Sequence, residues 1–299
     1  MGTQAQGYPA IQSGRPASGL LADPKLRRRL LVQIPIFLAL CLVALTTLLP
    51  LGYMALTALK DRTEYLTNPY GMPQGLYLDN FRLMVENYAF LRSFGNSVLI
   101  VGSALTLSLL IGSLAAFAVA KLRFRGKRVF FLFLISLQLI PGQVLLIPIY
   151  LLFSRLGMIN NYLSVILMYT VGSLPFSIFF LSASFRNLPN ELMEAAKIDG
   201  ASLRQIYLHI ILPIGRPAIL TLGILNFLSM WNELILALML LPDESKRTIT
   251  ASVSMVIGRF VTNQPLLMTG LLMSSLPTVV VLIIFSNYLV KGISAGIGK

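Results

Sequence analysis

The 299-residue sequence is poor in the residues from which most soluble enzymes and metal sites are built. It has one cysteine, Cys41, and one histidine, His209, which excludes a disulfide framework, a cysteine-built metal site and most sites that need imidazole. Charged residues make up only 12% of the chain, against roughly 25% in soluble domains. Since 56% of the residues are hydrophobic, the composition indicates a polytopic membrane protein.

Six apolar stretches are long enough to cross a bilayer as helices, which takes about 20 residues each. Glu233 is the one charged residue inside them, and the alternation with period two that a β-barrel needs is absent. We therefore expect an all-α membrane protein with a transmembrane domain over 31–290. Its six spans are expected at about residues 31–59, 96–120, 129–153, 163–185, 217–241 and 266–290.

The distribution of lysine and arginine predicts the orientation. With the N-terminus inside, the inner segments hold 16 of these residues and the outer segments hold 8. The densest cluster lies in the short segment 121–128, and short loops are where the positive-inside bias is strongest. We therefore expect cytoplasmic termini: a disordered N-terminal tail over 1–30 and a C-terminal tail over 291–299. Anionic lipid suffices as the partner of these basic residues, so no nucleic acid is expected.

The inner loop 186–216 carries start and stop signals for two helices. Pro189 suits a first helical position and Gly200 suits a helix end, which predicts a short helix over about 189–199. Ser202 and Gln205 have the spacing of a capping box that opens a second helix. A helix lying on the lipid surface is one alternative for the first segment, although its acidic first turn is unusual in such helices.

Several motifs resemble one family. Glu194-Ala195-Ala196, the glycine four residues later and Ile211-Leu212-Pro213 closely resemble the EAA loop of bacterial ABC importer permeases. The carbohydrate branch of that family is resembled by Asn96-Ser97, Trp231-Asn232-Glu233, Leu276-Pro277 and the segment from Gly292 to Gly296. The resemblance covers about residues 30–299 and looks closest to the smaller, six-span permease subunit of maltose-type sugar importers.

This resemblance implies a type I ABC importer-like permease fold in the cytoplasmic membrane of a bacterium or archaeon. It implies ATP-driven import of a sugar or oligosaccharide by alternating access. The implied partners are a second permease subunit, expected to be a different chain, two copies of a cytoplasmic ABC ATPase, and an extracytoplasmic solute-binding protein. The loop helix would dock on the ATPase through Glu191, Glu194, Ala195, Ala196, Asp199 and Gly200.

The sequence contains no enzymatic motif with the residues or the structural context that its chemistry needs. Nothing matches the phosphate-binding loop of glycine, four residues and Gly-Lys-Ser/Thr, so ATP and magnesium are expected on the partner ATPase. The segment 292–296 matches a hydrolase nucleophile elbow, but it follows a membrane helix and no histidine lies downstream. We therefore expect a non-enzymatic subunit that holds no cofactor.

Polar residues within the spans are the candidates for the solute pathway. A carboxylate inside a span costs about 2.5–3.5 kcal/mol on insertion scales, so Glu233 should face a cavity or a partner. Asn226 lies seven residues earlier, on nearly the same helix face. Pro141 and Gly142 should break the helix beside Gln143. The candidates are Gln143, Tyr169, Asn226, Asn232 and Glu233.

Several alternatives remain open at this point. One is that Glu233 sits near the outer mouth and only shapes the pore. Another is that the solute is a polyol or a glycerol-phosphate diester instead of a sugar. An ion-coupled secondary transporter would need ionisable groups near mid-membrane and often has internal repeats, whereas this sequence offers Glu233 alone and no repeat.

Overall fold

The computed structural model describes residues 24–259 and 263–297, and every regular element in these ranges is a helix. The all-α prediction is therefore confirmed for the described part of the chain. In order, the elements are α1 (Pro24–Ala58), α2 (Arg62–Thr67), α3 (Asp79–Asn87), α4 (Phe90–Lys121), α5 (Lys127–Leu137), η2 (Gly142–Leu145), α6 (Leu146–Arg155), α7 (Tyr162–Arg186), α8 (Asn190–Ile198), α9 (Leu203–Ile206), η3 (Tyr207–Ile211), α10 (Leu212–Trp231), α11 (Ile235–Leu240), η4 (Glu244–Lys246), α12 (Ile249–Arg259) and α13 (Gln264–Ile297).

Among the described residues, five helical segments are long and apolar enough to cross a membrane, or six if one bent pair counts as a single span. They are Val32–Ala58, Phe90–Lys121, Tyr162–Arg186, Leu203–Trp231 and Gln264–Tyr288, with the pair Lys127–Leu137 and Gly142–Arg155 as the sixth. The two parts of this pair are bent by 88°. The expected break at Pro141 is thus a sharp turn, because proline has no N–H to continue the helix and Gly142 opens a separate 3₁₀ turn.

Most of helix α1 lies in a compact unit that ends at Tyr53. Its apolar side chains are exposed from Val32 to Leu51, as at Phe37, which is 66% exposed. A helix that is apolar on all sides and exposed on all sides needs an apolar surrounding, either lipid or another chain.

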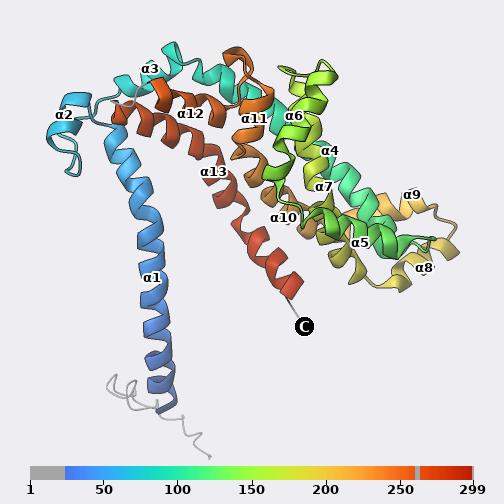
Figure 1. Ribbon diagram of the computed structural model, residues 1–299. Helices are drawn as coiled ribbons and strands as arrows, with labels where there is room; N and C mark the ends of the chain where they lie inside the picture. Colours follow the sequence, from blue (N-terminus) through green and yellow to red (C-terminus); the bar gives the residue numbers. More distant parts are fainter. Residues whose placement is uncertain (1–23, 260–262, 298–299) are drawn as a thin grey trace, which may run out of the picture. The chain divides into compact units, whose positions relative to one another are not determined.

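The second unit, Met54–Lys299, is organised around the long parallel pair α4 and α7, on which α10 packs (Figure 1). The two helices approach closely at Gly112 of α4, where an added Cβ would lie 3.0 Å from Cβ of Ser177. Small residues at such a crossing let two helices pack tightly within a membrane. The close pair therefore forms a rigid base for the side chains described below.

The helix expected over 217–241 differs from the observed one at both ends. It begins earlier, since α9, a π-helical segment and α10 run together from Leu203 to Trp231. It also ends ten residues earlier, at Trp231, and α11 starts at Ile235. The Glu233 carboxylate accepts hydrogen bonds from the N–H groups of the new helix, which is how a side chain ends one helix and starts another.

At the end of the bundle that carries α2, α3 and α12, a lysine is buried. Lys60 is only 1% exposed, and its ammonium donates to the carbonyl oxygens of Asn68 and Pro69 at 2.7 and 3.3 Å. Asn80 of α3 donates to the carbonyl of Lys60 in turn. These bonds fix the loop that follows α1 against α3, and nothing in the sequence analysis anticipated them.

Candidate functional site

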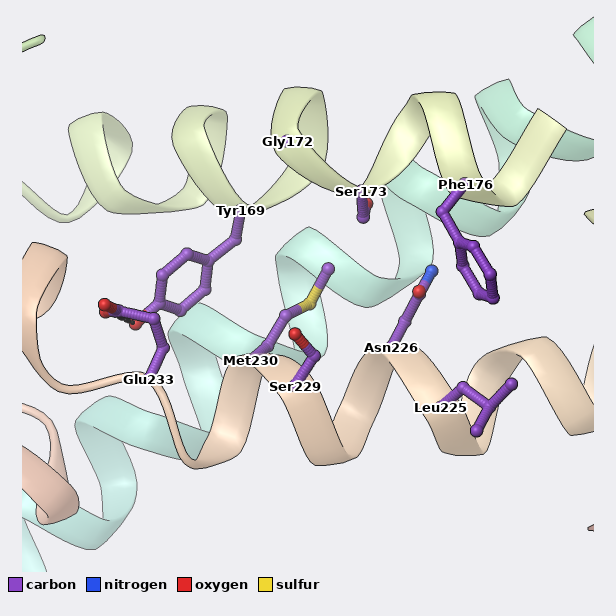
Figure 2. A pocket seen from close by; sticks show the side chains of 9 residues that line it. All are labelled: Tyr169, Gly172, Ser173, Phe176, Leu225, Asn226, Ser229, Met230 and Glu233. Carbon is purple, nitrogen blue, oxygen red and sulfur yellow. Dashed lines mark hydrogen bonds between the residues drawn. The ribbon is translucent and has the colours of Figure 1, made fainter. Parts of the chain in front are cut away.

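A cavity of about 320 Å³, lined by both polar and apolar side chains, lies between α7 and α10. Nine of the described residues line it: Tyr169, Gly172, Ser173 and Phe176 from α7, Leu225, Asn226, Ser229 and Met230 from α10, and Glu233 from the break that follows α10. Figure 2 shows Tyr169 and Glu233 close together at one end and Phe176 at the other. The volume is at the lower end of the range of about 300–1,000 Å³ that small-molecule sites occupy.

Three donors hold the Glu233 carboxylate at its end of the cavity. Tyr169 Oη donates to Oε2 at 3.0 Å, while the backbone N–H groups of Leu236 and Ala237 donate to Oε1 and Oε2 at 2.8 and 3.0 Å. Both oxygens accept, as a carboxylate does. The polar end of the cavity is therefore fixed by one side chain from α7 and by the first turn of α11.

Asn226 lies deeper in the same cavity and is 4% exposed. Its amide nitrogen donates to Ser177 Oγ of α7 at 3.0 Å and to Ser108 Oγ of α4 at 3.3 Å. The amide thus joins three helices within the membrane-spanning part, where each unpaired polar group costs free energy. It has a structural role in addition to any contact with a solute.

Of the five predicted pathway residues, Tyr169, Asn226 and Glu233 line this cavity. The other two do not. Gln143 is exposed in η2, at the turn between α5 and α6. Asn232 is exposed and donates to the carbonyl oxygen of Leu228 in its own helix, 2.8 Å away.

Six lining residues are not among the five predicted pathway residues, although their spacing could have identified them. On α7 the lining positions advance from Tyr169 by three, four and seven residues, and on α10 they precede Glu233 by three, four, seven and eight. This is the spacing of one helix face. Extending each candidate along its own face would have found Gly172, Ser173, Phe176, Leu225, Ser229 and Met230.

The loop between α7 and α10 contains the short helix predicted from its sequence. Gly200 has a φ of +80°, the left-handed conformation that glycine adopts without strain at a helix end. The capping box is present: Gln205 N–H donates to Ser202 Oγ, and the Gln205 side chain accepts from Ser202 N–H. Pro189 is the residue before the first helical residue instead of the first, so the helix extends over Asn190–Ile198.

Helix α8 turns one face inward and the opposite face outward. Met193 is buried, and Ala196 is half-buried against the cluster that Phe117, Phe185 and Tyr207 also form. Ala196 therefore lies at the inner side of α8, whereas Leu192, Ala195 and Asp199 are exposed. The exposed positions of α8 and of the residue that follows it are Asn190, Glu191, Leu192, Glu194, Ala195, Lys197, Ile198 and Asp199.

A lysine from another helix holds the start of α8. Lys121, the last residue of α4, donates to the carbonyl oxygen of Leu188 at 2.6 Å and to Oδ1 of Asn190 at 2.7 Å. Helix α8 is therefore held at its start by hydrogen bonds to the end of α4 and along its inner side by packing against its own loop, while its other side stays exposed. Its most exposed apolar residue is Ile198, at 86%.

Relatives with curated names cover nearly all of the described chain. The arabinooligosaccharides transport system permease protein of Halalkalibacterium halodurans is 31% identical over 258 residues, which are 85% of this chain and 92% of that protein. The melibiose/raffinose/stachyose import permease protein of Bacillus subtilis is 30% identical over 265 residues, which are 88% of this chain and 96% of that protein.

A solved structure shares the fold. A chain of a bacterial ABC transporter that imports the acidic polysaccharide alginate superposes with a TM-score of 0.76. It is 22% identical, and the match covers 93% of this chain and 99% of the other. At this sequence identity the similarity indicates a shared arrangement of helices and does not indicate which solute is transported.

The family to which the chain belongs is shown by a family model that matches more than half of its residues. Residues 108–295 match the model of the binding-protein-dependent transport system inner membrane component. This region contains the cavity, the break between α10 and α11, and α8 with its exposed face. With its several membrane-spanning helices, the protein is a multi-pass membrane protein, and the chain belongs to the family of binding-protein-dependent transport system inner membrane components.

Proposed function

We propose that this chain is a permease subunit of an ATP-driven importer that carries a sugar or oligosaccharide across the cytoplasmic membrane of a bacterium or archaeon. The observation that supports it most directly is the cavity between α7 and α10. A carboxylate, an amide and serine hydroxyls meet there beside an aromatic ring, inside helices that are otherwise apolar. Polar hydrogen-bonding groups beside an aromatic face suit a polyhydroxylated solute.

The named relatives support the same class of solute. The permease of Halalkalibacterium halodurans is named for arabinooligosaccharides, and that of Bacillus subtilis for melibiose, raffinose and stachyose. A third relative, from Thermococcus litoralis, is named as a trehalose/maltose permease and is 28% identical over 275 residues. A saccharide of a few rings is therefore the solute that we propose.

The proposed partners are a second permease chain, two copies of a cytoplasmic ATPase that bind ATP and magnesium, and an extracytoplasmic solute-binding protein. A second chain would cover the open side of the cavity and the exposed apolar side chains of the spans. A related permease has been solved in a complex with a pentasaccharide-bound periplasmic protein, which supports the last partner. With the N-terminus inside, α8 lies on the cytoplasmic side, where an ATPase would meet it.

In the proposed mechanism, ATP binding closes the ATPase pair and displaces α8. The displacement would pass into α4 through Lys121 and into α7 and η3 through the cluster around Met193, because these contacts leave α8 little freedom to move alone. The cavity between α7 and α10 would then open to alternate sides of the membrane.

The proposal is tested by purifying the tagged chain in mild detergent and identifying the proteins that accompany it. We expect a second permease and an ATPase with a phosphate-binding loop. Proteoliposomes containing this complex and its binding protein should take up at least one di- or trisaccharide in an ATP-dependent manner. A chain that purifies alone from several gentle detergents, and whose uptake follows an ion gradient, would overturn the proposal.

A further inference from the structure

The charge of the cavity narrows the class of solute. Of the nine described residues that line it, Glu233 alone carries a charge, and none is a lysine, arginine or histidine. The carboxylate is paired only with neutral donors, namely one phenol and two backbone N–H groups. Its negative charge is therefore not cancelled by any residue of this chain that lines the site.

A solute that brings a second negative charge into this cavity meets direct repulsion. Two like charges about 5 Å apart, at the effective dielectric constant of about 20 that suits protein sites, lower a binding constant by a factor on the order of one hundred. A uronate, a sulfonated sugar or a sugar phosphate pays this cost wherever its anionic group approaches Glu233. An uncharged sugar does not.

The same groups favour uncharged hydroxyls. A carboxylate offers about four lone-pair sites. Three donors already occupy sites on the Glu233 carboxylate, so roughly one site is left for a hydroxyl of the solute. The hydroxyls of Ser173 and Ser229 line the walls, and at the other end the ring of Phe176 is 37% exposed. An exposed aromatic face can pack on the C–H face of a sugar ring.

We propose that this cavity selects uncharged polyhydroxylated solutes and rejects anionic ones, and that Glu233 determines this selectivity. The inference rests on the proposed function for its physiological meaning, whereas the charge of the cavity can be measured without it. The alginate importer has the same arrangement of helices and an acidic cargo, so charge selectivity must come from individual side chains and not from the fold.

The charge is measured with thiol reagents on single cysteines. Cys41 is the only cysteine, so Cys41→Ser gives a clean background into which Ser229→Cys places a thiol in the cavity, four residues from Glu233. The reagents are cationic trimethylammonioethyl, anionic sulfonatoethyl and neutral hydroxyethyl methanethiosulfonate. The neutral reagent measures how accessible the introduced thiol is. A small free thiol in solution gives the intrinsic ratio of the reaction rates of the cationic and anionic reagents.

The measured quantity is the reaction rate of the cationic reagent divided by that of the anionic reagent. We expect this ratio to be about tenfold higher at Ser229→Cys than at the free thiol. Adding Glu233→Gln should return the ratio to within about threefold of the free thiol. Leu225→Cys is the matched control, because it lines the same cavity about 12 Å from Glu233 along the chain direction, against about 6 Å for Ser229, and should show a smaller preference. A ratio equal to that of the free thiol, or one unchanged by Glu233→Gln, overturns the inference. So does failure of all three reagents to react, since the cavity would then be closed to solutes.

Transport separates this inference from the function on which it rests. The purified complex is offered galactobiose and digalacturonate, together with other neutral disaccharides and their uronate counterparts. Uptake confined to neutral members supports the inference. ATP-dependent uptake of a uronate in preference to its neutral counterpart overturns it and leaves the proposed function intact. If no saccharide is taken up with ATP, the proposed function fails, and the thiol reaction still decides the charge of the cavity.

Discussion

Two of the helix interruptions in the described part of the chain are held in different ways. The one between α8 and α9 is built from residues that are neighbours in the sequence: Gly200 ends the first helix, and Ser202 with Gln205 starts the second. The one between α10 and α11 depends on Glu233, whose carboxylate also accepts from Tyr169 of α7, 64 residues away. The first interruption presents a surface to solvent, whereas the second places a charge beside a cavity.

The surroundings of the second interruption show why it depends on tertiary structure. Trp231, the last residue of α10, donates through Nε1 to the carbonyl oxygen of Ser274 in α13 at 3.1 Å. Its own carbonyl accepts from Thr250 Oγ1 of α12 at 2.8 Å. Together with α7, whose Tyr169 donates to Glu233, α12 and α13 thus fix the point where α10 ends. The comparison teaches that a helix end made by local signals can present a docking face, while one made by distant contacts can build a site between helices.

The largest loss of thermal stability is expected for Glu233→Ala. The change leaves the Tyr169 hydroxyl and two backbone N–H groups without their acceptor, each a loss of about 1–3 kcal/mol when buried. We expect the free energy of unfolding in detergent to fall by about 3 kcal/mol, measured from thermal denaturation. Asn232→Ala is the matched control, because that exposed side chain bonds only within its own helix, to Leu228, and its loss should change little. Equal effects of the two variants would contradict a role for the carboxylate in holding the break.

A smaller loss is expected at the local interruption for Gly200→Val. No heavy atom lies within 4 Å of an added Cβ, so the cost comes from the backbone alone, at a φ of +80°. A left-handed conformation costs a non-glycine residue about 1–2 kcal/mol. Gly200→Asn should cost less, because asparagine tolerates this conformation better. If both variants are as stable as the wild type, the glycine is not needed for the backbone turn.

Removal of the cap should have a still smaller effect. Ser202→Ala deletes the side-chain acceptor of the Gln205 N–H, a loss of about 1 kcal/mol for an N-cap. Ser202→Thr keeps the hydroxyl and should retain most of the stability. The measurement is again thermal denaturation of the purified protein, and a threonine variant as unstable as the alanine variant would argue against capping.

The smallest change in stability should accompany the largest change in function. Glu194 lies on the exposed face of α8, so Glu194→Lys should alter the free energy of unfolding by no more than about 0.5 kcal/mol. If that face meets the ATPase, the variant complex should lose solute-stimulated ATP hydrolysis and uptake. Glu86→Lys is the matched control, since it reverses an exposed charge on α3. Normal transport by Glu194→Lys would remove α8 from the coupling pathway.

Much of the local structure could be predicted because its causes are local. The apolar runs predicted the membrane-spanning helices, and the sequence around Gly200 predicted both the end of α8 and the capping box of α9. Pro141 predicted a break in the third span, but not that the two parts would be bent by 88°. A missing N–H interrupts a helix, whereas the angle of the turn is set by what each part packs against.

The site was only partly predictable for the same reason. Polarity within a span singled out Glu233 and Asn226, and both line the cavity, whereas Gln143 was singled out by the same criterion and lies elsewhere. The sequence by itself determined a helical membrane protein with a short helix exposed in its loop, because hydrophobicity and capping act over a few residues. Tertiary structure alone decided which polar side chains share a cavity, since that depends on how distant helices are rotated and where they end against one another.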